Sequence, residues 1–548
     1  MPGGAAAAGP TLSLSGTAGK GGPPMPAPPV PPPATGPAGP RPAALGRRSF
    51  FGLSLGAGAG LALSACGGQA TSALGGAGST LKWGWDLPSS WDPVTSSAGW
   101  DVHTLSLVYS ALTKLDEHGA PVPALASSWR YDPDGTAVTF TLRPGLRFAD
   151  GTVLDADAVK RSIERGRDYP KSLIAAQLAG IRKVIARDPR TVRIELAAPD
   201  YQIPALLAGK TGMVVNPRAF EKDAAALATR PDGAGPYTLV SYVQNSKAVL
   251  RRNPRYWDAA RIKVRDFEVY PLPEPSTVVA ALTSGQYNVA QIPGSQVAAA
   301  RAAGLKVQVI PSMVVAVLDV NLDRSPFTHP NVALALKYAV DREQLLKTAS
   351  FGHGQTSRQP FPAGYVGHDP ALERLFPYDP AKARQLVESA GAGREVSLTL
   401  SAQNAEGVPE VIQAQLARAG IKATISTVPA ARATELVYVQ RSTSLYVDQF
   451  AGRESATQAF QVLFGKQGLM NPGRRSPAAL EAAVAEVSRT PLDAPAYPAV
   501  LRRATGIAVR TMPNVFLYTV PRILARNAQV SAIPPYPVVQ RFEGVTVA

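Results

Sequence analysis

Short stretches that alternate apolar and polar residues occur along the chain, and stretches of helical periodicity lie between them. The run Val138 to Leu142 and the run "TVRIEL" at 191–196 alternate in the manner of half-buried strands. After Asp155, apolar residues recur at helical spacing, so Asp155 is the expected N-cap of a helix. The interleaving of strand and helix patterns predicts an α/β protein.

Two longer helical patterns lie in the second half of the chain. The run "PNVALALKYAVDREQLLKTAS", at 330–350, predicts one amphipathic helix whose apolar face contains Val332, Leu336, Ala339 and Val340. The run "DPAKARQLVESAG" predicts a second helix, capped by Asp379 and closed by Gly391.

A strand, a helix and a strand follow one another at 395–401, 410–420 and 421–427. This order, with short connections, predicts a βαβ unit in which the two strands are parallel. The fold class is therefore α/β with some α+β character.

An apolar run of 13 residues, Leu53 to Ala65, ends at Cys66, which is the single cysteine of the chain. It is too short to span a bilayer, which takes about 20 residues, and it has the composition of an export signal. The sequence Leu63 to Cys66 resembles the lipobox of bacterial lipoproteins, which implies that Cys66 is lipidated and becomes the mature N-terminus. Arg47 and Arg48, before "SFF", resemble the twin-arginine export motif. Export by the Sec pathway is the alternative to export by the twin-arginine pathway.

The segments on either side of this signal contain no recognisable catalytic or binding motif. Residues 1–45 are mostly Ala, Gly and Pro, so we expect a long disordered leader or a true start at Met25. Residues 67–80, "GGQATSALGGAGST", predict a flexible linker.

Charge and length narrow the class of protein. The formal net charge is +16, and because four basic and no acidic residues lie in 1–65, the rest carries +12. No basic block interleaved with aromatic residues is present, so we expect no nucleic-acid partner. The excess positive charge is consistent with contact with an anionic lipid or cell-wall polymer, or with a solvated protein surface.

A chain of 548 residues predicts two or three domains. Their folds must be stabilised by burial of apolar residues, because a single cysteine allows no disulfide within the chain.

Five sequence segments occur in a fixed order along the chain: "LDEHGAPVPALASSW", "LRPGLRFADGT", "GAGPYTLVSY", "SPFTHPNVALALKYAVDREQLL" and "YDPAKARQLVESAG". In them the chain resembles the extracellular solute-binding proteins, family 5, of ABC importers, which bind oligopeptides, dipeptides or nickel. The resemblance implies a two-lobed, venus-flytrap fold with an extra domain and an interlobe ligand cleft. It also implies a monomer that delivers a small, possibly peptide-like, solute to an ABC permease and its ATPase subunits.

The resemblance further implies a domain plan, with a hinge where the chain crosses near Val320 and near Asn514. The plan is a leader and signal peptide (1–66), a linker (67–80), lobe I in three parts (81–112, 233–320 and 515–548), the extra domain (113–232) and lobe II (321–514).

Three segments are expected to line the cleft: the loop from Ser96 to His103, the strand at Met313 to Val315, and the stretch from Phe450 to Glu454. The candidate ligand-binding residues are Ser96, Trp100, His103, Met313, Val315, Phe450 and Arg453. In peptide-binding relatives a Trp followed by an Asp lines this cleft, and the Asp pairs with the peptide amino group. Here Phe450 stands in place of the Trp and Arg453–Glu454 follow, which leaves peptide specificity open. Arg453 favours an anionic group on the solute, unless it pairs with Glu454 or Asp448.

Two other functions are alternatives for an exported protein of this kind: an exported hydrolase and a surface lipoprotein without a transport role. No G-x-S-x-G elbow follows Cys66 and no H-E-x-x-H motif is present, so no catalytic residue is expected. The histidines share no metal-ligand spacing, and neither a metal nor another cofactor is expected. The loop of His353 is the one expected to approach the cleft. The histidines are His103, His118, His329, His353 and His368.

Replacing Cys66 by Ser should release the protein from the membrane fraction, because the serine hydroxyl cannot take the thioether-linked lipid. Fractionation with a carbonate wash, followed by immunodetection, measures this. A Cys66→Ser protein that stays in the washed membranes would contradict the lipid-anchor assignment.

Overall fold

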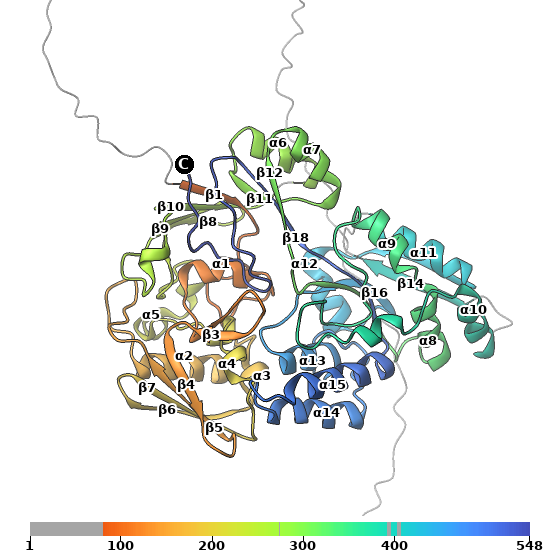
Figure 1. Ribbon diagram of the computed structural model, residues 1–548, viewed down its shortest axis with the longest axis horizontal. Helices are drawn as coiled ribbons and strands as arrows, with labels where there is room; N and C mark the ends of the chain where they lie inside the picture. The colour runs from red at the N-terminus through yellow and green to blue at the C-terminus, as the bar shows by residue number, and fades with distance from the viewer. Residues whose placement is uncertain (1–79, 273, 392–395, 403–406) are drawn as a thin grey trace, which may run out of the picture. The chain divides into compact units, whose positions relative to one another are not determined.

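The computed structural model describes residues 80–272, 274–391, 396–402 and 407–548 (Figure 1). Cys66, Arg47, Arg48 and the signal predicted around them lie outside these residues. No helix in the described ranges has the length and apolarity needed to cross a membrane.

A seven-stranded sheet forms the first part of the fold, in the order β12-β18-β11-β1-β10-β9-β8. In it β1 pairs in parallel with β10 and β11, while the other pairs are antiparallel. Helices α6 and α7 lie beside one end of this sheet (Figure 1). The strands are β1 (Thr80–Gly84), β8 (Tyr237–Val243), β9 (Lys247–Arg252), β10 (Asp266–Tyr270), β11 (Val289–Gln291), β12 (Lys306–Ile310) and β18 (Arg522–Arg526), and the helices are α1 (Asp101–Val108), α6 (Val278–Thr283) and α7 (Val297–Ala302).

The segment inserted between α1 and β8 builds a four-stranded antiparallel sheet, β4-β5-β7-β6, and a two-stranded one, β2-β3. Helix α2 packs on β6 and β7, and the apolar residues between them form a separate core. The elements are β2 (Thr113–Leu115), β3 (Pro121–Pro123), β4 (Ala126–Tyr131), β5 (Ala137–Leu142), α2 (Ala156–Asp168), α3 (Ala175–Leu178), β6 (Ile181–Asp188), β7 (Thr191–Leu196), α4 (Ile203–Leu206) and α5 (Pro217–Asp223).

Residues 315–519 contain a five-stranded sheet in the order β15-β14-β16-β13-β17. Strands β14 and β15 are parallel and joined by α11, which confirms the predicted βαβ unit. The elements are β13 (Val315–Val320), α8 (Pro330–Ala339), α9 (Arg342–Ala349), α10 (Pro380–Ser389), β14 (Val396–Ala402), α11 (Val408–Arg418), β15 (Ile421–Thr427), α12 (Ala430–Ala433), β16 (Leu445–Phe450), α13 (Ala456–Phe464), α14 (Ala478–Arg489), α15 (Tyr497–Thr511) and β17 (Val515–Thr519).

The prediction of one long helix over 330–350 is wrong, because two helices, α8 and α9, occupy that stretch. Val340 has extended backbone angles, and the Asp341 side chain accepts a hydrogen bond from the Gln344 amide at 3.0 Å. An aspartate that caps the next helix competes with continuation of the first. The predicted caps at Asp155 and Asp379 are confirmed, since each accepts a hydrogen bond from the amide three residues later.

Two chain segments join the seven-stranded and five-stranded sheets, and they run side by side. Strand β12 pairs with β18 in the first sheet, and β13 pairs with β17 in the second. Between the sheets, the Val520 amide donates to the Val314 carbonyl at 2.9 Å, and Ser312 Oγ donates to the Val520 carbonyl at 2.5 Å.

The crossings therefore lie at 311–314 and 520–521 rather than near Val320 and Asn514. Residues 315–320 and 515–519, expected in lobe I, belong to the five-stranded sheet because their ladder bonds hold them there. The other domain boundaries stay predictions.

A buried ion pair ties the inserted domain to the loop that follows β1. The Arg165 guanidinium on α2 holds both carboxylate oxygens of Asp92, at 2.9 and 2.6 Å, and the two side chains are 7% and 1% exposed. The Asp92 carbonyl also accepts the Ser96 amide at 3.0 Å, so this pair fixes the start of the predicted cleft loop.

Replacing Asp92 by Asn should lower the free energy of unfolding by about 3–5 kcal/mol, because it leaves a buried guanidinium without its counter-charge. Urea denaturation followed by circular dichroism measures this. Glu481→Gln, which breaks the exposed pair of Glu481 with Lys466, is the matched control and should cost about 1 kcal/mol or less. Equal losses in the two variants would show that the buried Asp92–Arg165 pair contributes no more to stability than an exposed ion pair does.

Candidate functional site

The loop after β1 is ordered around one carboxylate. Asp101 accepts hydrogen bonds from Ser89 Oγ at 2.5 Å, from the Ser89 amide at 3.2 Å and from Ser96 Oγ at 2.7 Å. The Lys210 ammonium donates to the carbonyls of Ser96 and Ala98, each at 3.0 Å. Burial lowers the pKa of Lys210, while the nearby Asp101 and Glu454 carboxylates oppose that shift. The hydroxyl of Ser96, a predicted ligand contact, is thus engaged within the protein.

Trp100 and His103 form an aromatic cluster with Trp85. The His103 ring lies edge-on to Trp85 with centroids 5.1 Å apart, and it stacks on Trp100 at 6.0 Å. His103 Nδ1 accepts the Gln540 amide at 2.9 Å. Burial, with a smaller effect of Arg522, holds the His103 pKa well below its ordinary value. His103 is therefore neutral and packs inside the protein.

Met313, Val315 and Phe450 meet where β13 begins and β16 ends. Val315 and Phe450 are paired in register, and both side chains are buried. Met313 packs against Gly452, and a Cβ on that glycine would lie 2.7 Å from Met313 Cβ. Its sulfur also approaches Gly119 of the β2–β3 turn, so these side chains hold the strand ends against the inserted domain.

Arg453 and Glu454 follow Phe450 and have different surroundings. The Arg453 guanidinium lies 5.4 Å from the centre of the Phe450 ring and donates to the Gly452 carbonyl at 2.5 Å. The Glu454 carboxylate packs on the backbone of Gly209, where a Cβ would overlap it. Burial raises the pKa of Glu454, and the charges of Arg453 and Lys210 oppose that rise.

A cavity of about 720 Å³ lies between the inserted domain and the part of the chain that carries the five-stranded sheet. Its size suits a ligand of a few hundred daltons. The lining comes from the β2–β3 turn, from the start of α4, from the loop before α10, from the start of α13 and from the start of α15; these are residues within 118–121, 202–205, 364–370, 454–456 and 492–502.

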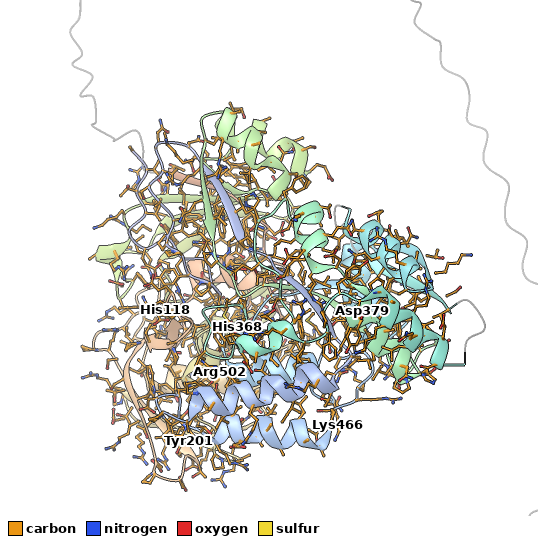
Figure 2. All side chains as sticks on the ribbon, turned by 45° about the vertical axis from the view of Figure 1, so that its right-hand side comes forward. His118, Tyr201, His368, Asp379, Lys466 and Arg502 are labelled. Carbon is orange, nitrogen blue, oxygen red and sulfur yellow. The ribbon has the colours of Figure 1, made fainter. Side chains whose placement is uncertain are left out.

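Polar groups converge on this cavity. The Tyr497 hydroxyl donates to Gln202 Oε1 at 3.3 Å, while Gln202 Nε2 is buried and has no hydrogen-bond partner in the described residues. The Tyr365 ring stacks on Phe361 with centroids 5.0 Å apart and forms part of the wall. Figure 2 shows His118, His368 and Arg502, which all line the cavity. An unpaired buried amide N–H costs free energy unless water or a ligand accepts it.

A sequence profile of the bacterial extracellular solute-binding proteins, family 5 (middle region), matches residues 120–471. The chain belongs to the bacterial extracellular solute-binding proteins, family 5. The glutathione-binding protein GsiB of Salmonella paratyphi A is 33% identical over 339 residues, which are 60% of this chain and 65% of GsiB. The GsiB of Escherichia coli O157:H7 is 32% identical over the same length. The match thus spans less than two thirds of these relatives.

Solved structures of two-lobed periplasmic binding proteins share the fold of this family 5 protein. DppA of Helicobacter pylori, in complex with the peptide STSA, superposes with a TM-score of 0.77 at 22% identity, covering 85% of this chain and 97% of DppA. AgaA of A. tumefaciens R10, in complex with agropinic acid, gives 0.76 at 23% identity, covering 86% and 99%. The predicted fold class, α/β with two lobes, is confirmed.

None of the seven predicted ligand-binding residues lines the cavity, and their contact with a solute stays a prediction. Glu454, at the end of one predicted segment, does line it. His353, whose loop was expected to approach the cleft, instead packs near Gly294. His118 and His368 line the cavity, although no sequence feature singled them out. Within the described residues, no group of three His, Cys, Asp or Glu side chains is arranged to hold a metal.

A network of two carboxyl groups and a phenol lies beneath the Phe450 segment. Tyr438 Oη is 2.6 Å from Asp319 Oδ2 and also contacts Asp448 Oδ2, and Asn514 Nδ2 donates to Asp319 Oδ1 at 2.8 Å. The phenol has one proton, so its second contact requires a protonated carboxyl. Burial, and then the charge of Asp448, raise the pKa of Asp319 to about 8.

Asp319 should make the protein less stable as the pH rises from about 4 to about 8, because the folded protein keeps a proton on Asp319 that the unfolded chain releases. The loss from one such group approaches about 1.4 kcal/mol per pH unit. Asp319→Asn should remove much of this dependence, and Asp323→Asn, on the exposed end of the same segment, should not. Urea denaturation at pH 5, 6.5 and 8 measures it. Parallel pH profiles for wild type and Asp319→Asn would contradict the shared-proton network.

Proposed function

We propose that this protein is the solute-binding component of an ABC importer and captures a small, peptide-like solute in the cavity of about 720 Å³. The observation that carries the proposal is this cavity, which lies between the inserted domain and the part of the chain that contains the five-stranded sheet. The two segments at 311–314 and 520–521 join that part to the seven-stranded sheet. Ligand contacts on both walls would favour a closed arrangement of the lobes. No chemical turnover is part of this role.

The relatives support a solute built from amino acids. The curated relatives are named for glutathione, and the solved structures of similar fold hold the peptide STSA, the dipeptide Met-Leu and Ni(L-His). In this chain Glu454 supplies an acidic group at the cavity wall, suited to an amino group, and Tyr365 supplies an aromatic surface. The combination fits a small solute with both charged and apolar parts.

The proposal includes the route to the importer. After export, Cys66 would carry the lipid that holds a monomeric protein at the outer face of the cytoplasmic membrane or in the periplasm. Residues 67–79 would leave the binding domain free to meet the permease and its ATPase subunits. The segment resembling a lipobox is the support for this part of the proposal.

Filling the cavity should abolish solute binding without unfolding the protein. Ala494 is half-buried and lines the cavity, so Ala494→Trp places an indole in the ligand volume. Ala499→Trp, on an exposed position of α15, is the matched control. Native mass spectrometry of the purified full chain, and thermal shift with glutathione and a panel of di- and tripeptides, provide the readouts.

We expect wild type and Ala499→Trp to retain or bind the same solute and Ala494→Trp to bind it at least tenfold more weakly. Equal binding by the three proteins would exclude this cavity. Failure of wild type to bind or retain any small molecule would count against the solute-binding function itself.

A further inference from the structure

A basic surface lies on the seven-stranded sheet, along β9, β10 and the loop between them. Residues 247–268 contain seven basic and three acidic residues, so this segment has a net charge of +4. That is a third of the +12 that residues 66–548 carry. All of its basic side chains are exposed except that of Lys247, which is half-buried; they are Lys247, Arg251, Arg252, Arg255, Arg261, Lys263 and Arg265.

The acids of this segment neutralise only part of its charge. Arg251 and Arg265 share one carboxylate, that of Asp266, at 3.3 and 2.8 Å. Arg261 lies 4.0 Å from the carboxylate of Asp258. One acid that serves two arginines leaves a surplus of positive charge at this surface.

Three further cations of the segment, Arg252, Arg255 and Lys263, donate to backbone carbonyls, at 3.2, 3.2 and 2.7 Å. Within the described residues none of the three forms an ion pair. Because these side chains are solvated, each is stable without a counter-charge. Their summed field at the surface is what attracts an anionic partner.

This surface adjoins the start of β1. Thr80, the first residue of β1, is paired in register with Asp266 of β10, and Asp266 is paired with Arg251 of β9 (Figure 1). Only 13 residues separate Cys66 from Thr80, and 13 residues span at most about 45 Å. With a lipid on Cys66, the basic surface therefore stays within reach of the bilayer.

From this charge and position we infer that residues 247–268 contact the anionic headgroups of the membrane to which Cys66 is anchored. The inference rests on the lipid anchor of the proposed function. Attraction between exposed charges acts over about 10 Å, so it requires a surface that the tether brings to the bilayer. A lipid chain and a basic surface act together in membrane anchoring.

The contact would turn one side of the seven-stranded sheet toward the membrane. The cations are solvated and spread over 22 residues, which suits a layer of headgroups better than a single bound anion. None of the residues that line the cavity of about 720 Å³ belongs to this segment. Membrane contact and solute binding therefore use different residues.

Flotation with lipid vesicles tests the inference on the full chain carrying Cys66→Ser, so that no attached lipid contributes. The probes are vesicles of phosphatidylcholine alone and vesicles with about one third phosphatidylglycerol. We expect the Cys66→Ser chain to bind the anionic vesicles and not the neutral ones. High salt should abolish this binding, because it screens interactions between exposed charges.

Removing three of the charges by Arg252→Gln, Arg255→Gln and Lys263→Gln should weaken binding to the anionic vesicles at least tenfold. Each Lys or Arg near such a surface contributes about fivefold in affinity. Arg252→Lys with Arg255→Lys keeps the charge and should bind as the parent chain does, which separates loss of charge from damage to the fold.

The matched control removes three exposed charges from α9 and α10 and should also bind as the parent chain does. Thermal melting of both triple variants should match the parent, because all the substituted side chains are exposed. The control substitutions are Lys347→Gln, Lys382→Gln and Arg384→Gln.

Undiminished binding by the first triple variant, or equal binding to neutral and anionic vesicles, would overturn the inference. Equal losses in the two triple variants would assign the binding to overall net charge and would overturn it too. Binding to soluble polyphosphate without binding to vesicles would identify an anionic polymer in place of the membrane, with the same consequence. The lipid anchor is decided separately by the carbonate wash of the Cys66→Ser protein, since that wash removes contacts that depend on charge alone.

Discussion

The arrangement of the site depends on a single antiparallel ribbon. The chain leaves the seven-stranded sheet through β12 and β13 and returns through β17 and β18, and the two passages are hydrogen-bonded to each other in both sheets. Between the sheets the ribbon keeps only a few bonds, among them the one from the Val520 amide to the Val314 carbonyl. A short stretch with few bonds between two rigid sheets is where a rotation of one lobe against the other costs least.

In the described residues, hydrogen bonds between the two walls of the cavity join uncharged groups. The Tyr201 amide donates to the Ser488 carbonyl at 2.8 Å, the side-chain amides of Gln177 and Gln458 meet, and Tyr497 bonds to Gln202. Hydrogen bonds between neutral groups contribute about 0.5–1.5 kcal/mol each after their exchange with water. Each of these bonds is weak, so a solute that bridged both walls would shift the balance between arrangements of the lobes through its own contacts.

Sequence patterns predicted the local structure better than the long-range geometry. The caps at Asp155 and Asp379 and the βαβ unit follow from nearby residues, and they are confirmed. The break at Asp341 was missed because an apolar face continues through it, although the aspartate that caps the second helix is visible in the sequence. The predicted crossings near Val320 and Asn514 fall inside or beside strands, because strand pairing across about 200 residues leaves no local signal in the sequence. His118 and His368 reach one cavity from loops 250 residues apart, and no spacing rule links them.

The segment after Phe450 shows that neighbouring side chains of one loop have different surroundings. From the sequence, Arg453 is the residue of this segment that we expect at the cleft. The structure sets its guanidinium over Phe450 and brings the carboxylate of Glu454 to the cavity. A positive group then comes from another element, α15, through Arg502. Acidic and basic side chains thus stand on separate walls of the cavity, because those walls belong to different elements. The charged groups at the cavity are therefore contributed by several parts of the fold and do not come from a single sequence motif.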